Sequence, residues 1–139
     1  MIITKDVEVR FRDIDSMGHV NNAVYLNYFE QARMKYFSLI IGEKWDWQKH
    51  GMVVARQEID YKIPVLLNDE VQLETWCEKL GNASIILRYR LNITRNGQSS
   101  IAVKGKTILV CYDNILQNVT PVPQAWRDRV EVLPDEFEK

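Results

Sequence analysis

Apolar and polar residues alternate along most of this chain. Between residues 7 and 12 every second position is apolar and the positions between them are charged, which predicts a strand with one wet face. Similar runs later in the chain predict four more strands, over residues 53–62, 71–79, 84–94 and 99–112. The pair Asn96-Gly97 is a strong signal for a tight hairpin turn between the last two strands.

After Asn22 the spacing between apolar residues changes from two residues to three or four. Apolar residues recur at helical spacing as Tyr25, Phe29, Ala32, Tyr36 and Ile40. The few polar positions occupy a narrow sector, so we expect protein to cover most of this helix. Asn21 or Asn22 is a candidate cap at its start, and Gly42 is a candidate stop signal.

The order of elements is a strand, a long helix and an antiparallel meander, followed by a short helix at residues 124–129 after Pro121 and Pro123. Such a chain can bury its helix if the sheet curls around it. The sequence therefore predicts an α+β fold and a single domain over residues 1–139. The far face of the sheet would stay partly exposed, which favours oligomerisation.

Composition narrows the function classes. With 18 basic and 19 acidic residues among 139, the chain lacks the positive field that nucleic-acid binding requires. Neither a signal peptide nor a membrane span of about 20 apolar residues is found, so we expect a cytoplasmic protein with no membrane partner. Cys77 and Cys111 lie in apolar runs and are predicted to be buried thiols. With only two histidines, they make no convincing metal site.

Candidate chemistry concentrates between the first strand and the long helix, where two carboxylates, a histidine and two amides follow one another. The first turn of a helix has unpaired N–H groups and a partial positive charge, so it can stabilise an oxyanion that develops on a carbonyl group. Asp15, a few residues upstream, can present its carboxylate to the same carbonyl carbon.

This segment carries a specific motif. From Asp13 to Arg33 it reads D-x-D-x-x-G-H-V-N-N-x-x-Y-x-x-Y-x-E-x-A-R, and it resembles the signature of hotdog-fold thioesterases related to 4-hydroxybenzoyl-CoA thioesterase. Downstream, I-D-Y-x-x-P at residues 59–64 and Asn68-Asp69 resemble the same family. The strand order fits the family to about Tyr112.

The resemblance implies a hotdog fold, in which a sheet of about five strands wraps a central helix. It implies hydrolysis of acyl-CoA thioesters to a free acid and coenzyme A, without metal or organic cofactor. Asp15 would be the catalytic carboxylate, acting as nucleophile through a mixed anhydride or as general base for water. The N–H group of Asn22 would donate to the thioester oxygen, and Val20, Asn21 and Tyr25 would line the site. A homodimer, with the site at its interface, or a homotetramer is implied as well.

Nearby residues have competing interpretations. Asp13 is expected to be structural, bonding loop amides or pairing with Arg10 or Arg12. His19 can orient Asp15 or a water, or be a hydrogen-bonded loop residue. Glu30 is the rival catalytic carboxylate, because another branch of hotdog thioesterases uses a helix-borne Glu.

Candidates for coenzyme A phosphates are basic residues on the strands. They are Lys62, Arg88, Arg90, Lys104 and Lys106. Solvated strand faces have the same appearance in a sequence, so both interpretations stay open. Trp45, Trp47 and Met52 are candidates for an acyl pocket or for ordinary loop packing.

Three other functions stay open. The substrate could be a carrier-protein thioester. A hotdog hydratase or dehydratase could pair Asp15 with His19, although the Asp-x-Asn-Pro-x-His pattern of such enzymes is absent. A non-catalytic acyl-CoA binding module would bind without turnover. The sequence leaves acyl chain length and aromatic against aliphatic preference undetermined.

Overall fold

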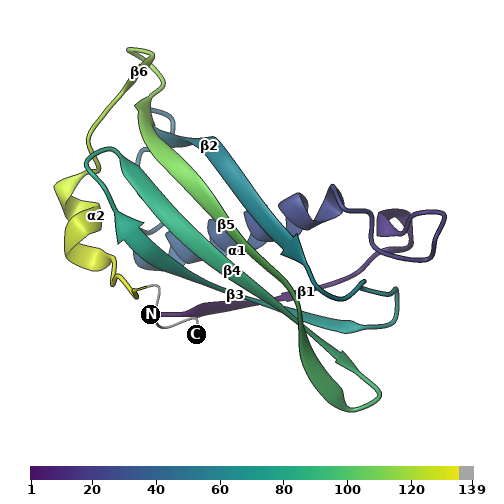
Figure 1. Ribbon diagram of the computed structural model, residues 1–139. Coiled ribbons are helices and arrows are strands. Elements are labelled where there is room, and N and C mark those ends of the chain that lie inside the picture. The colour runs from purple at the N-terminus through teal and green to yellow at the C-terminus, as the bar shows by residue number, and fades with distance from the viewer. Residues whose placement is uncertain (135–139) are drawn as a thin grey trace.

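The structure, a computed structural model, describes residues 1–134 and combines one long helix with one antiparallel sheet (Figure 1). Its elements are β1 (Ile3–Val7), η1 (Phe11–Asp13), α1 (Val24–Ile40), β2 (His50–Tyr61), β3 (Glu70–Leu80), β4 (Ser84–Arg95), β5 (Gln98–Asp113), β6 (Asn118–Val119) and α2 (Gln124–Arg129). The four later strands and the short helix agree closely with the predicted ranges.

The strands are ordered β1-β3-β4-β5-β2, and β6 pairs with β5. Hairpins join β3, β4 and β5, and the turn between β4 and β5 places Asn96 at φ 53° and Gly97 at φ 77°, the left-handed conformations that the Asn-Gly pair predicted. Among the strands of residues 1–134, β1 pairs only with β3 and β2 only with β5, so these two strands lie at opposite edges. The prediction of an α+β fold is confirmed.

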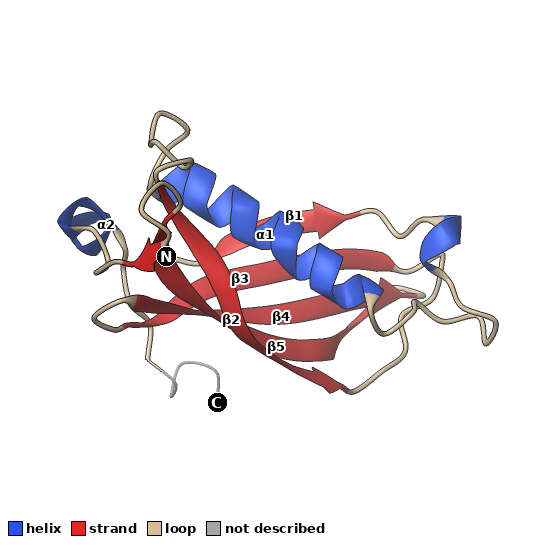
Figure 2. Cartoon of the chain, turned by 90° about the horizontal axis from the view of Figure 1, so that it is seen from above, coloured by secondary structure: helices blue, strands red, loops and turns tan. Residues whose placement is uncertain are grey.

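The core lies between α1 and one face of the sheet (Figure 2). Strand β4 alternates buried and half-buried positions along its length, as predicted for a strand with one face inward. Phe29 of α1 stacks on Tyr89 of β4 with ring centroids 4.3 Å apart and planes within 3°. Cys77 and Cys111 are buried and free, as predicted. No helix in residues 1–134 is both long and apolar enough to span a membrane.

The prediction of a strand over residues 7–12 was wrong. β1 ends at Val7, opposite Val71 near the beginning of β3, so the residues that follow have no partner strand. Instead Asp13 accepts a hydrogen bond from the N–H group of Arg10 (2.9 Å) and its own N–H donates to the Arg10 carbonyl (2.9 Å). These local bonds turn the chain into η1 and leave Phe11 82% exposed.

Both ends of α1 show how the chain enters and leaves it. Gly42, at φ 102°, donates to the carbonyl of Phe37 (3.1 Å) and stops the helix as predicted. Arg129 of α2 donates to the carbonyl of Ile41 (2.6 Å), which places a cation at the negative end of the helix. The side chain of Asn21 bonds the N–H group of Ala23 (2.9 Å) just ahead of the helix, so it turns the chain into α1 rather than capping the first helical turn.

Candidate active site

Asp15 lies in a tight loop between η1 and α1. An isolated bridge between Ile14 and Val20 closes this loop, and the N–H group of Asp15 donates to the carbonyl of His19 (2.7 Å). Gly18, at φ 81°, donates to the carbonyl of Asp15 (3.1 Å). The backbone of the loop is therefore fixed by its own hydrogen bonds.

The Asp15 carboxylate is oriented on one side only. Its Oδ1 accepts hydrogen bonds from the N–H groups of Met17 (2.8 Å) and His19 (3.2 Å). Within residues 1–134 no donor contacts Oδ2, and the residue is half-buried. The carboxylate thus has a fixed direction and one oxygen available to another molecule.

Just ahead of α1, a few residues after the loop of Asp15 in the sequence, lies an unpaired backbone amide. The N–H groups of Ala23 and Val24 both bond Asn21, through its Oδ1 (2.9 Å) and its carbonyl (2.9 Å). Asn22 is exposed, and among the described residues its N–H group has no acceptor. Its carbonyl accepts a hydrogen bond from the Tyr61 hydroxyl at the end of β2 (3.0 Å), which holds this peptide in place.

Val20 and Tyr25 form the buried base of the segment. They are 4% and 3% exposed, and both contact Val65. The N–H of Val20 donates to the carbonyl of Val65 (2.9 Å), and the N–H of Val65 donates to the hydroxyl of Tyr25 (3.4 Å). Burial raises the pKa of Tyr25, and the charge of Asp15 adds to this rise. The Asp15 carboxylate is therefore close enough to act electrostatically on a predicted lining residue.

Two neighbouring residues take the roles expected of structural groups. Asp13 bonds the Arg10 amide and accepts the hydroxyl of Tyr28 (2.8 Å), which fastens η1 to α1. His19 contacts Asp15 through backbone atoms, and its imidazole has no hydrogen-bond partner in residues 1–134. A role of the imidazole in catalysis stays a prediction.

The candidates for binding coenzyme A phosphates separate into three groups. Arg88 and Arg90 lie on the outer face of the sheet and form ion pairs with Glu78 (3.0 Å) and Glu74 (2.9 Å). These pairs weaken the assignment, because each cation already faces a carboxylate. Lys62 directly follows Tyr61, whose hydroxyl bonds the Asn22 carbonyl just ahead of α1. The remaining candidates, Lys104 and Lys106, share the outer face of β5, where Lys106 pairs with Glu58 of β2 (3.5 Å).

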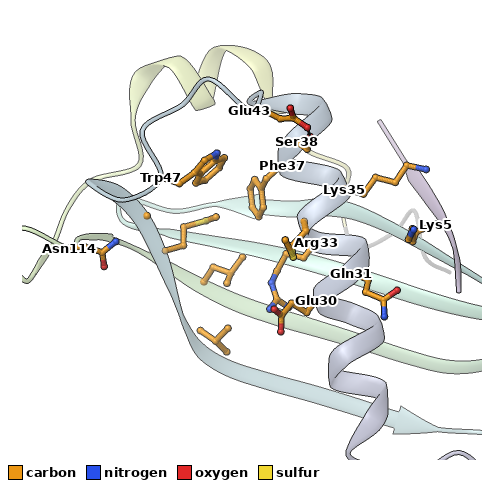
Figure 3. Close-up of a pocket in the computed structure, with 15 residues that line it drawn as sticks. Lys5, Glu30, Gln31, Arg33, Lys35, Phe37, Ser38, Glu43, Trp47 and Asn114 are labelled. Atoms are coloured by element: carbon orange, nitrogen blue, oxygen red, sulfur yellow. Dashed lines mark hydrogen bonds between the residues drawn. The ribbon is translucent and has the colours of Figure 1, made fainter. Parts of the chain in front are cut away.

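A cavity of about 820 Å³ lies between α1, β2 and the loop that joins them (Figure 3). Trp47 and Met52, two acyl-pocket candidates, line it, whereas Trp45 packs against Trp126 with ring centroids 5.4 Å apart. The rival carboxylate Glu30 points into this cavity beside an apolar wall. Asp15 does not line it. The loop of Asp15 instead borders a smaller cavity at Gly18.

The model of the thioesterase-like superfamily matches residues 9–130. The chain belongs to this superfamily. A Thermus thermophilus thioesterase, solved with coenzyme A and zinc, is 42% identical to it, with a TM-score of 0.78 over 91% of this chain and 90% of that one. A solved 4-hydroxybenzoyl-CoA thioesterase, 17% identical, has a TM-score of 0.83 over 94% of this chain and 99% of its own, which shows the fold alone. The predicted hotdog fold and thioesterase family are confirmed.

Two curated relatives show how far the similarity extends. The long-chain acyl-CoA thioesterase FadM of Escherichia coli is 27% identical over 130 residues, which cover 91% of this chain and 96% of FadM. The Bacillus subtilis protein YsmA is 34% identical over 84 residues, which cover 60% of this chain and only 56% of YsmA. Similarity to FadM therefore spans nearly the whole of both chains.

The residues that support the site from a distance were missed by the sequence analysis. Val65, Tyr61 and the ion pair of Asp69 with Arg95 all contribute to holding the segment of Asp15 and Asn22. Tyr61 and Asp69 were noted only as parts of the family motifs, without a supporting role. Nothing in the sequence pointed to Arg95, because a charged residue beside a hairpin turn is common and usually solvent-exposed.

Proposed function

We propose that this protein hydrolyses acyl-CoA thioesters to a carboxylic acid and coenzyme A, with Asp15 as its catalytic carboxylate. One observation carries the proposal: Asp15 has a free, oriented carboxylate oxygen in the segment that leads into the unpaired Asn22 amide at the start of α1. Support for the substrate comes from FadM, which is named as a long-chain acyl-CoA thioesterase, and from the Thermus relative, which was solved with coenzyme A.

In this mechanism the thioester oxygen accepts a hydrogen bond from the Asn22 N–H, and the positive end of α1 stabilises the charge that forms there. As a general base, Asp15 takes a proton from water while the water oxygen bonds to the acyl carbon and the C–S bond breaks. As a nucleophile, Asp15 itself bonds to that carbon and expels the thiolate of coenzyme A. Water then cleaves the mixed anhydride.

The test replaces Asp15 with Asn, which keeps the shape and removes the charge. We expect Asp15→Asn to lower kcat for acyl-CoA hydrolysis by about 10²- to 10⁴-fold, the usual contribution of such a group, with the thermal midpoint little changed. Thiol release is followed with a chromogenic disulfide. The matched control is Asp128→Asn on the exposed face of α2, which should retain full turnover.

Other outcomes point to other functions. Full turnover in Asp15→Asn but loss of turnover in Glu30→Gln would move the chemistry to the rival carboxylate. Tight acyl-CoA binding without thiol release in the wild-type protein would indicate a binding module. Hydration of crotonyl-CoA would indicate a hydratase, and faster release from carrier-protein thioesters of equal acyl length would indicate that substrate class.

We propose that the reaction needs no metal or organic cofactor. In residues 1–134 no group of three or more His, Cys, Asp or Glu side chains could hold a metal ion. Dialysis against a strong chelator should therefore leave kcat unchanged, although the Thermus relative was solved with zinc. Loss of activity on chelation, restored by zinc, would refute this part of the proposal.

We also propose that the protein acts as a homodimer or homotetramer. β2 is a twelve-residue edge strand, and its Val53 and Val54 are 43% and 46% exposed. A long edge strand with exposed apolar residues favours pairing with another strand. Sedimentation analysis should give a multiple of the chain mass of 16.3 kDa, and a monomer at assay concentration would contradict this. The cytoplasmic location stays a prediction for cell fractionation to test.

A further inference from the structure

The loop between β2 and β3 contacts the segment of Asp15 and Asn22 at two points. Val65, in this loop, is fully buried. The carbonyl of Val65 accepts a hydrogen bond from the N–H of Val20, the residue that closes the loop of Asp15 by its bridge to Ile14. The N–H of Val65 donates to the hydroxyl of Tyr25 in the first turn of α1. A displacement of Val65 would therefore move both the carboxylate and the helix start.

An ion pair fixes the shape of this loop. Arg95, the last residue of β4, donates Nε to Asp69 Oδ1 (2.7 Å) and Nη2 to Asp69 Oδ2 (2.6 Å), and the same Nη2 donates to the carbonyl of Pro64 (3.0 Å). Asp69 Oδ2 also accepts the N–H of Leu66 (2.8 Å), and the N–H of Asp69 donates to the Leu66 carbonyl (3.1 Å). Residues on both sides of Val65 are thus tied to one guanidinium.

The burial of the pair suits a structural constraint rather than a solvated contact. The Asp69 side chain is 2% exposed and that of Arg95 is 36% exposed. A bidentate arginine–carboxylate pair has one preferred geometry, and a lysine cannot reproduce it because its ammonium group is a point charge. The hydrogen bonds from Arg95 hold the pKa of Asp69 below its ordinary value, so the pair stays charged at neutral pH.

We propose that Asp69 and Arg95 are positioning residues for thioester hydrolysis, acting through Val65 on the Asp15 carboxylate and on the amide at the start of α1. This inference rests on the proposed function of Asp15. Neither side chain contacts Asp15 or Asn22 directly. Their effect is on geometry, and a misplacement of about 1 Å can cost about 10²-fold in rate.

The chain offers a matched control for a merely structural role. Asp113, at the end of β5, is 4% exposed and accepts the N–H groups of Ile115 and Leu116 (both 2.9 Å). It braces a loop as Asp69 does. Asp113 lies opposite His50, at the beginning of β2. Tyr61, which contacts Asn22, lies at the other end of that strand.

The experiment measures kcat, KM and the thermal midpoint for Asp69→Asn, Arg95→Lys and Asp113→Asn as full-length proteins. We expect Asp69→Asn to lower kcat by about 10- to 100-fold with little change in KM, because substrate binding is less sensitive to the orientation of Asp15 than the reaction is. Arg95→Lys, which keeps the charge, should fall between Asp69→Asn and the wild type. Asp113→Asn should lower the midpoint and leave kcat unchanged.

Equal kcat in Asp69→Asn and the wild type, together with a lowered midpoint, would overturn the inference and leave the pair a stabilising contact. If Asp69→Asn fails to fold, Arg95→Lys decides, because an unchanged kcat there refutes the positioning role. Failure of the proposed function is seen separately: it would appear as full activity in Asp15→Asn, whatever the Asp69 and Arg95 variants do.

Discussion

Gly105 of β5 is the position where a single methyl group should disturb the packing of α1 most directly. A Cβ atom built there would lie 2.5 Å from Cε2 and 2.7 Å from Cζ of Phe29, and 3.0 Å from the carbonyl oxygen of Glu58. The ring cannot retreat along its normal, because it is stacked on Tyr89. Gly105→Ala therefore requires α1 to lift from the sheet or Phe29 to leave its rotamer.

Overpacking of this kind costs about 1–3 kcal/mol. An unfolding entropy of about 2.1 cal/mol/K per residue, applied to 139 residues, converts this to a fall of about 3–10 °C in the thermal midpoint. The control is Ser100→Ala, an exposed position on the same strand, which should leave the midpoint unchanged.

The assay is thermal unfolding followed by circular dichroism, carried out at one protein concentration for all variants. The penalty should nearly vanish when Gly105→Ala is introduced into Phe29→Ala, because the clashing ring is gone. A midpoint for Gly105→Ala within error of the wild type, or an equal penalty in both backgrounds, would show that Phe29 does not occupy the space above Gly105.

Two further predictions concern ionisable groups. Burial raises the pKa of Cys77 and of Cys111 to about 11, so both thiols should react slowly with a chromogenic disulfide at pH 8 and rapidly in denaturant; fast reaction of the folded protein would contradict their burial. Hydrogen bonds from Arg90 lower the pKa of Glu74, as those from Arg95 lower that of Asp69, so the unfolded chain binds protons more readily than the folded protein. The stability that these pairs provide is present at neutral pH and should be lost as pH falls through the folded-state pKa values. In urea titrations Glu74→Gln should therefore be less stable than the wild type at pH 7 and approach it in acid; a constant difference would refute this.

The sequence revealed the candidate site residues but not the residues that hold them in place. The motif around Asp15 located the candidate carboxylate, the unpaired amide of Asn22 and the buried residues Val20 and Tyr25, all within one short segment. Such a segment is readable because its chemistry is local. The surrounding support was not readable, since Arg95 lies 75 positions beyond Val20 and no local pattern connects them.

The same distinction explains why the first strand was predicted wrongly and why the ion pairs of two candidate cations were not foreseen. Alternation over residues 7–12 described a genuine polarity pattern, but β1 ended at Val7, because β3 extends only one residue, Glu70, beyond the partner Val71. Arg88 and Arg90 were read as candidates for phosphate binding. Their carboxylate partners Glu78 and Glu74 come from the neighbouring strand, whose register a single sequence does not display.

By itself the sequence determined the long helix, the antiparallel meander and the family motif around Asp15, because hydrophobic period and turn residues act over a few neighbours. Only the tertiary structure decided where the first strand ends, which cations are already paired and how the loop of Asp15 is held. Those features depend on which distant residues meet, and a hydrogen bond such as that from Val20 to Val65 exists only once the strands have been assembled.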